Sequence, residues 1–257
     1  MREPKTIAIT GASSGIGAAL ARHYASAGRV LALSGRNAQR LDEVARDCRA
    51  AGAVVEATVF DITDQQALES WLRDTDGRHP LDLVVANAGI SAGTGTFGED
   101  ATQTRQILSV NVDGVVSTVL SAVALMRPRR RGQIAIMSSL AAFRGFPGAP
   151  AYCASKAAVR VWGEALRGMV AGEGLTVSVI CPGYVKSPMT AVNDFPMPFL
   201  MDSARAARII ERGLAAGKAR IVFPRRLFAV VWLLSLLPPS WTDPLLTRLP
   251  EKPASEG

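Results

Sequence analysis

Two residues that could perform acid–base chemistry, Tyr152 and Lys156, stand four positions apart at the start of a predicted helix. Side chains at this spacing share one face of a helix. An ammonium group beside a phenol favours the phenolate and lowers a pKa that is normally about 10. A tyrosine tuned in this way can give its proton to a carbonyl oxygen as hydride arrives at the carbon. Lys156 is one of only five lysines beside 24 arginines.

Two further polar residues could belong to the same site. Ser139 follows the predicted strand Gln133–Met137 and could donate to the same oxygen, while Asn111 interrupts the apolar pattern of a long predicted helix. Each residue alone has a purely structural explanation: a helix-start aromatic, a solvated charge, a loop hydroxyl and a helix distortion beside Gly114. Together they favour a catalytic site.

A glycine-rich segment, TGASSGIG at Thr10–Gly17, lies between the first predicted strand and the first predicted helix. Its glycines follow the spacing GxxxGxG rather than GxGxxG. Glycines at such a turn let the backbone approach a pyrophosphate at the helix N-terminus, and the serines can donate to phosphate. The residues predicted to contact a dinucleotide here are Gly11, Ser13, Ser14, Gly15, Ile16 and Gly17.

The end of the second predicted strand indicates which ribose the site accepts. An acid about 20 residues after the glycine loop would bind the 2′-OH of NAD. The chain instead has Ser34 and Arg36, with no acid before Asp42. Arg36 can pair with a 2′-phosphate and Ser34 can add a hydrogen bond, so NADP(H) is favoured over NAD(H). An ordinary surface arginine is the alternative interpretation.

Two more turns are predicted at the same rim, because they end the third and fourth strands. Asp61, followed by Ile62, is placed to accept from an adenine amino group. In the turn Asn87-Ala88-Gly89, the asparagine can brace the first glycine turn and the glycine lets the backbone pass the cofactor. The additional cofactor contacts expected here are Asp61, Ile62, Asn87, Ala88 and Gly89.

Short apolar runs alternate with helical patterns, and this alternation predicts a doubly wound α/β Rossmann fold with a parallel sheet buried on both faces. Predicted strands are Thr6–Thr10, Val30–Ser34, Val54–Phe60, Leu83–Ala86, Gln133–Met137, Val177–Cys181 and Ile221–Phe223. Predicted helices include Ile16–Ala27, Arg40–Ala51, Thr102–Met126 and Ala154–Val170. The expected division is one dinucleotide-binding and catalytic domain at residues 1–224 and an apolar extension at residues 225–257.

Composition excludes several other classes of protein. The 257 residues are 48% hydrophobic and 20% charged, which is typical of a globular chain. Three unpaired cysteines and two histidines argue against a disulfide framework or a metal centre. The net charge is 29 − 22 = +7, but the run Arg127–Arg131 has no interleaved aromatics and is expected to be a solvated loop rather than a nucleic-acid site. No secretory signal opens the sequence, so a cytoplasmic protein is expected.

An apolar segment near the end, Leu227–Leu237, follows Arg225-Arg226 and stops at Pro238-Pro239. Its eleven residues are too few to cross a bilayer, which takes about 20. A buried or dimer-interface helix is the first interpretation, and a peripheral membrane contact or a pocket wall is the alternative. The tail after Pro250 is expected to be disordered.

With these motifs in order, the chain resembles the short-chain dehydrogenase/reductase family from about Lys5 to Phe223. The residues that carry the resemblance are TGASSGIG at Thr10–Gly17, NAG at Asn87–Gly89, Asn111, SSL at Ser138–Leu140, YCASK at Tyr152–Lys156 and PG at Pro182–Gly183. The resemblance implies a seven-stranded sheet and a catalytic tetrad of Asn111, Ser139, Tyr152 and Lys156.

The same resemblance implies a role for each member of the tetrad. Tyr152 would be the acid/base and Ser139 would position the carbonyl. Lys156 would lower the tyrosine pKa and bind the nicotinamide ribose, and Asn111 would hold a water in the proton relay. The residues implied to border the nicotinamide are Pro182, Gly183 and Val185, and Ser187 stands where the family often has threonine.

The segment Met189–Met201 corresponds to the variable substrate lid of the family and is apolar, which suits a lipophilic carbonyl substrate. Core packing of a short loop is the alternative. The apolar segment Leu227–Leu237 puts the tetramer common in the family in doubt, while a homodimer through the helices around Asn111 and Tyr152 is expected.

These observations predict an NADP(H)-dependent carbonyl reductase or alcohol dehydrogenase acting on a moderately hydrophobic small molecule. One alternative is an epimerase or dehydratase that uses bound nucleotide transiently. Another is a non-catalytic, membrane-associated nucleotide-binding scaffold.

Overall fold

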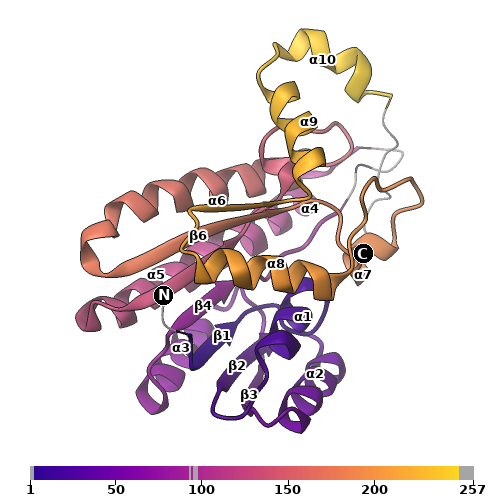
Figure 1. Cartoon of the computed structure of the whole chain (residues 1–257). Coiled ribbons are helices and arrows are strands. Elements are labelled where there is room, and N and C mark those ends of the chain that lie inside the picture. Colours follow the sequence, from indigo (N-terminus) through magenta and orange to yellow (C-terminus); the bar gives the residue numbers. More distant parts are fainter. Residues whose placement is uncertain (1–2, 93, 95–97, 249–257) are drawn as a thin grey trace.

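The computed structural model describes residues 3–92, 94 and 98–248 and contains a seven-stranded parallel sheet (Figure 1). The strand order is β3-β2-β1-β4-β5-β6-β7. The strands are β1 (Thr6–Ile9), β2 (Val30–Gly35), β3 (Val54–Val59), β4 (Leu83–Ala86), β5 (Gly132–Met137), β6 (Leu175–Pro182) and β7 (Arg220–Phe223). The doubly wound single-domain fold predicted from the sequence is therefore confirmed.

Helices cover both faces of this sheet. The main helices are α1 (Gly15–Tyr24), α2 (Ala38–Ala50), α3 (Gln65–Arg78), α4 (Ala101–Leu108), α5 (Gly114–Met126), α6 (Pro150–Met169), α7 (Pro188–Ala191), α8 (Ser203–Ala215), α9 (Arg225–Ser235) and α10 (Pro239–Leu246). Helices α1, α2 and α8 share one apolar cluster with the sheet, and α3, α5 and α6 share the cluster of the opposite face.

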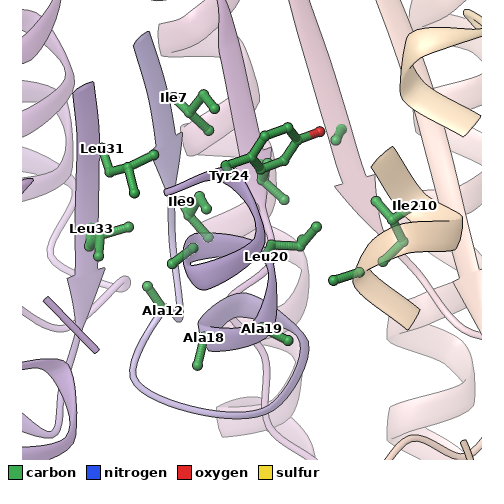
Figure 2. Close-up of a cluster of buried hydrophobic side chains, with 14 of the residues drawn as sticks. Ile7, Ile9, Ala12, Ala18, Ala19, Leu20, Tyr24, Leu31, Leu33 and Ile210 are labelled. Atoms are coloured by element: carbon green, nitrogen blue, oxygen red, sulfur yellow. The ribbon is translucent and has the colours of Figure 1, made fainter. Parts of the chain in front are cut away.

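Strand β1 shows why apolar runs without alternation become central strands. Ile7 and Ile9 point toward α1, where they pack with Leu20 and Tyr24 (Figure 2). Ala8, between them, belongs to the cluster on the opposite face. Because successive side chains of a strand point to opposite faces, a central strand has to be apolar at every position.

Strand β3 corrects the expectation that every strand is buried on both faces. It pairs only with β2 and forms one edge of the sheet. Val54 and Val59 are 57% and 52% exposed. The apolar run Val54–Phe60 resembles that of a central strand, but its place in the strand order leaves one side without a neighbour.

The predicted long helix Thr102–Met126 also differs in the structure. The chain forms α4, then a π-helical turn η1 (Ser109–Asp113), then α5. The combined stretch Ala101–Arg129 is long and apolar enough to cross a membrane by length and composition. It packs against α3 and α6 in the layer that covers the sheet, so we assign it as a core helix.

The arginine-rich run after α5 forms a short 3-10 turn, Arg127–Arg129, that leads into β5. Three of its guanidinium groups are paired with carboxylates: Arg127 with Glu173, Arg129 with Asp76 and Arg131 with Asp82. These ion pairs bind the turn to neighbouring elements. The sequence predicted a solvated loop and did not predict these pairs.

The apolar segment Leu227–Leu237 forms most of α9, and the interpretation that it is a buried helix is wrong. Within α9 only Val231 is buried. A further helix, α10, begins at Pro239, where the sequence pattern predicts only a break. The predicted disorder after Pro250 falls outside the described residues.

Candidate active site

The predicted site residues follow the carboxyl ends of the central strands. The chain proceeds from β1 outward to β3, then returns to β4 on the other side of β1. Ligands of open α/β sheets bind at such a switch point, outside the carboxyl ends of the strands. The glycine loop after β1 and the Asn87 turn after β4 are therefore neighbours.

The glycine loop leaves open the N-terminus of α1. Gly11 and Gly15 have φ angles of +67° and +55°, a region that favours glycine. Helix α1 starts at Gly15, and the side chain of its N-cap residue, Ser14, makes no capping hydrogen bond. Helix N-terminal amides without a cap attract an anion. This geometry fits the pyrophosphate of a dinucleotide.

Asn87 holds this loop in place. Its Nδ2 donates to the carbonyl oxygens of Thr10 and Gly11 at 3.0 and 3.1 Å. The Thr10 hydroxyl in turn accepts from the backbone N–H groups of Asn87 and Ala88 at 3.0 and 3.1 Å. A Cβ at Gly17 would collide with the Gly11 carbonyl oxygen. Asn87 thus makes the bracing contact predicted from the sequence.

Arg36 and Asp61 lie together at the ends of β2 and β3. Arg36 Nη1 is 3.5 Å from Asp61 Oδ2, and its side chain is 55% exposed. Partial burial opposes ionisation of Asp61, but hydrogen bonds from Thr63 and the Arg36 guanidinium outweigh it, so the pKa of Asp61 is lowered. The sequence predicted separate roles for the two residues, on phosphate and adenine, and did not anticipate their contact.

Ser34 and Ile62 are less accessible than the sequence suggested. Ser34 is 2% exposed, and Ile62 is 7% exposed and packs against Gly114. Gly35 was missed: a Cβ there would lie 3.0 Å from Ser13 Oγ, so this glycine lets the loop approach β2. Its position at the end of β2 was the available signal.

Lys156, Asn111 and Gly89 converge at the centre of the site. A Cβ on Gly89 would stand 3.1 Å from both Lys156 Nζ and Asn111 Oδ1. Lys156 is 3% exposed and donates from Nζ to the Met137 carbonyl oxygen at 3.1 Å. Residues from the turn after β4, from η1 and from α6 therefore meet around one buried ammonium group.

Asn111 acts as a clamp inside the π-helical turn. Its Oδ1 accepts from the Ile90 amide at 2.8 Å, and its Nδ2 donates to the Ile90 carbonyl oxygen at 2.9 Å and to Ser155 Oγ at 3.0 Å. An asparagine has two donors and two acceptor positions, so one acceptor position of Oδ1 is left. Asn111 joins the chain after β4 to α6.

The Ser139 hydroxyl lies close enough to Tyr152 to act on it as a hydrogen-bonding group, which works to lower the pKa of the tyrosine. Ser139 follows β5 and caps the short 3-10 helix Leu140–Ala142, with Oγ accepting from the Ala141 amide at 3.1 Å. Tyr152 lies in the first turn of α6, which begins at Pro150. The helix starts earlier than predicted, and both Tyr152 and Lys156 lie within it.

Burial shifts the pKa of both members of the pair toward the neutral form. Burial raises the pKa of Tyr152 to about 12, although the Ser139 hydrogen bond acts in the opposite direction. Burial also lowers the pKa of Lys156 to about 8. Lys156 Nζ lies 5.8 Å from the centre of the Tyr152 ring. The expected lowering of the tyrosine pKa is therefore wrong for the described structure.

Two serines that support the pair were missed as site residues. Ser155 Oγ donates to the Tyr152 carbonyl oxygen at 2.7 Å and accepts from Asn111. Ser138 Oγ donates to the Lys156 carbonyl oxygen at 2.8 Å. Both lie beside a predicted residue in the sequence, and this adjacency was the only available signal.

The end of β6 forms another wall. Pro182 O accepts from Ser139 Oγ at 3.4 Å, and the Gly183 amide donates to Phe223 O at 2.7 Å. Val185 is buried and pairs with Met201, which closes the base of the lid segment Met189–Met201. Ser187 caps α7.

The lid itself presents apolar side chains to the surface, so packing in a core does not explain its composition. Val192, Phe199 and Leu200 are 58%, 52% and 39% exposed. Tyr184 and Phe195 form an edge-to-face contact with ring centres 6.3 Å apart. Among the described residues, no group of three His, Cys, Asp or Glu side chains could hold a metal ion.

The fold is that of a Rossmann-type oxidoreductase, and its candidate site brings together Ser139, Tyr152 and Lys156. The model of the short chain dehydrogenase family matches residues 5–195. The chain belongs to the short-chain dehydrogenase family.

Relatives of similar length support this membership. An uncharacterized oxidoreductase of Myxococcus xanthus is 38% identical over 95% of this chain and 97% of its own. One from Mycobacterium tuberculosis is 32% identical over 92% of this chain and 95% of its own.

Solved structures show the same fold. A short chain dehydrogenase/reductase from Burkholderia phymatum, in complex with NAD, has a TM-score of 0.83 at 24% identity and covers 98% of both chains. A short-chain type dehydrogenase/reductase from Mycobacterium marinum has a TM-score of 0.76 at 25% identity, covering 85% of this chain and 93% of its own.

Proposed function

We propose that this oxidoreductase uses NADP(H) to interconvert a carbonyl group and a secondary alcohol of a hydrophobic small molecule. The observation that carries the proposal is the meeting of Ser139 and Tyr152, where the Ser139 hydroxyl acts to lower the pKa of Tyr152, with Lys156 on the same helix. A tyrosine that is neutral at pH 7 and lies beside a second hydroxyl is suited to protonate a carbonyl oxygen.

Each side chain has a distinct task in this proposal. Ser139 Oγ orients the substrate oxygen, and Tyr152 holds the proton that this oxygen receives. Lys156 returns a proton to Tyr152 after the tyrosine has protonated the substrate. Asn111 fixes the chain around Ile90 to α6 through its hydrogen bonds to Ile90 and Ser155. The nicotinamide, when bound, supplies or accepts the hydride.

The cofactor-binding residues follow from the geometry of the loops. The uncapped amides of α1 receive the pyrophosphate, the nicotinamide lies beside Gly183 and Val185, and Lys156 binds its ribose. Arg36 receives the 2′-phosphate, for which its exposed guanidinium is suited. Asp61 then contacts the adenine side of the cofactor while it remains next to Arg36.

The lid carries the preference for an apolar substrate. Val192, Phe199 and Leu200 of the lid offer exposed hydrophobic area, and the Val185–Met201 pair joins the lid to the chain after β6. Exposed apolar side chains of a soluble domain often mark a binding surface. A lipophilic ketone or the corresponding alcohol suits this apolar lid better than a charged substrate.

The test is NADPH oxidation against ketones and acyl thioesters that range from small and polar to steroid-like. Turnover confined to the apolar members is expected, and Tyr152→Phe should lower it by about 10²- to 10⁴-fold while cofactor binding persists. Tyr24→Phe is the matched control, because Tyr24 is a core residue on α1.

Two outcomes would contradict the proposal. Normal turnover by Tyr152→Phe would show that Tyr152 is not the proton donor. Conversion of a substrate without net consumption of NADPH would favour an epimerase or dehydratase.

We further propose a cytoplasmic homodimer. Leu120 on α5 and Val161 on α6 are 47% and 56% exposed, and both helices lie in the layer that contains Asn111 and Tyr152. Pairing of this face with a second copy would cover these side chains.

A further inference from the structure

The two C-terminal helices, α9 and α10, expose more apolar surface than their own packing explains. We call residues 225–248 the C-terminal hairpin. Its exposed apolar side chains, each at least 45% accessible, are Val230, Trp232, Leu233, Leu236, Trp241 and Leu245. Monomeric soluble proteins rarely expose so many large apolar groups together.

The C-terminal hairpin projects from the molecule instead of lying along the sheet. In Figure 1, α9 rises from the end of β7, and α10 lies beyond it, away from α1, α2 and α3. Its base is fixed: Phe143 and Phe228 form an edge-to-face contact at 5.2 Å, and Arg144 donates to Thr242 and Asp243 at 2.7 and 3.0 Å. The exposed apolar groups therefore sit on an anchored projection.

The charges around this projection are positive. Arg225 and Arg226 are exposed at the start of α9, and within the described chain neither has an ion-pair partner. The sequence between Arg212 and Thr242 contains no Asp or Glu. The next acid, Asp243, is paired with Arg144. An anionic partner is therefore complementary to the hairpin.

We propose that the C-terminal hairpin docks into the headgroup region of an anionic lipid bilayer. Tryptophans such as Trp232 and Trp241 favour that region, because one part of the indole ring is apolar and its N–H is polar. Arginines beside an apolar helix face bind anionic lipids. Helix α9 has eleven residues, so it lies in the interface and does not span the bilayer.

A second copy of this chain fits the same surface less well. In a twofold contact the same patch meets itself, so each copy would bring Arg225 and Arg226, and no unpaired acid of the described hairpin, to the shared interface. Like charges across an interface oppose association. The charge pattern favours lipid over self-association.

Docking would bring the substrate side of the site to the membrane surface. Leu227 and Phe228 of α9 pack against the small buried cluster that contains Leu140, the residue after Ser139. A Cβ on Gly183 would stand 3.0 Å from Leu227 Cδ2. This consequence rests on the proposed function: a lipophilic substrate could pass from the bilayer to the lid without crossing water.

The experiment is flotation of the full chain with vesicles of phosphatidylcholine, with and without about one third phosphatidylglycerol, at low and high salt. Binding to the anionic vesicles is expected, weakened by salt. Val230→Ser/Leu233→Ser should reduce the affinity by about tenfold or more. Arg225→Gln/Arg226→Gln should abolish the preference for anionic lipid, at about fivefold for each arginine.

The matched control is Val54→Ser/Val59→Ser, because these valines on β3 are as exposed as Val230 and Leu233. It should bind vesicles like the wild type. Cofactor titration and circular dichroism verify that each variant is folded, and soluble ketones test the proposed function separately.

The proposal is overturned if the wild type stays unbound with both vesicles, or if the hairpin variant floats as well as the β3 variant. It is also overturned if Val230→Ser/Leu233→Ser instead converts a dimer to a monomer in sedimentation velocity. In that case the hairpin is a contact between copies of the chain.

Discussion

Burial shifts both Tyr152 and Lys156 toward their neutral forms: it raises the pKa of the tyrosine and lowers the pKa of the lysine to about 8. A lysine whose pKa lies near neutral can exchange a proton readily in the working pH range. Burial therefore brings Lys156 into the range of ready proton exchange, at a cost in stability, and it keeps Tyr152 protonated at neutral pH.

The stability cost of Lys156 predicts a pH dependence. The pKa of this lysine is about 8 in the fold and 10.5 ordinarily, so below about 8 the folded state pays the full penalty of a buried charge. Between these values the unfolded chain binds more protons, and stability rises with pH. Lys156→Met should thus be more stable than the wild type at pH 7 by about 1–3 kcal/mol, and the difference should shrink toward pH 10.5.

The measurement is urea unfolding of both proteins at several pH values. Only the difference is informative, because burial raises the pKa of Cys48 to about 11 and of Cys181 to about 12, which lowers the stability of both proteins at high pH. Lys218→Met is the control for loss of an exposed lysine. A difference that does not change with pH would contradict the burial penalty.

Arg36 carries the prediction on cofactor choice. Arg36→Gln removes the positive charge without adding a carboxylate beside Asp61. NADPH affinity should fall by about 10- to 100-fold, since a hydrogen bond to a charged group contributes about 1.5–3 kcal/mol, while NADH affinity should change little. Fluorescence titration measures both, with Arg46→Gln on α2 as the control. An equal loss of affinity for NADPH and NADH would contradict the proposed contact between Arg36 and the 2′-phosphate.

The sequence predicted most residues of the site but few of their interactions. Tyr152, Lys156, Ser139 and Asn111 could be found because their types and order are distinctive. The raised pKa of Tyr152 could not be predicted from the sequence, because it depends on how the fold removes the phenol from water. The Arg36–Asp61 contact joins two strands, and no local pattern encodes it.

At the scale of the element, the glycine loop depends on one close approach between backbones. Gly17→Ala would place a methyl group against the Gly11 carbonyl oxygen and 2.6 Å from Asn87 Nδ2. The backbone of the glycine loop would have to shift to make room for this methyl group. We therefore expect a loss of about 1–3 kcal/mol in stability and weaker cofactor binding.

Thermal unfolding and cofactor titration check this expectation. Gly77→Ala on α3 is the control, because a Cβ there meets nothing within 4 Å. It should stabilise the helix by about 0.5–1 kcal/mol. If the two substitutions behaved alike, the close approach would not matter.

The sequence predicts a strand or helix well where the local pattern of apolar residues alone determines it. Strand ends such as those of β4 agree with the apolar run, since central parallel strands have no polar positions. The π-helical turn at Ser109–Asp113 and the exposed edge strand β3 were not predictable. The first depends on the clamp that Asn111 makes with Ile90 and Ser155, and the second depends on strand order.

At the scale of the whole molecule, the α5–α6 face should mediate self-association. Val161→Lys would place a charge in the centre of the proposed interface, where desolvation is costly. We expect the wild type to sediment as a dimer and the variant as a monomer. Val54→Lys, on the edge strand at the far side of the sheet, should stay dimeric. A wild-type monomer would contradict the proposal.

Arg144 limits how the C-terminal hairpin can be exchanged between relatives. The side chain of Arg144 is only 17% exposed, its pair with Asp243 crosses from the loop after β5 to α10, and its Nε has no partner among the described residues. Consider a chimera that takes the residues after Pro224 from a relative without an acid at position 243. Arg144 would then lose its ion-pair partner, at a cost of several kcal/mol for a mostly buried charge. Residue 144 and the hairpin must therefore be transplanted together, as a single unit of inheritance or design.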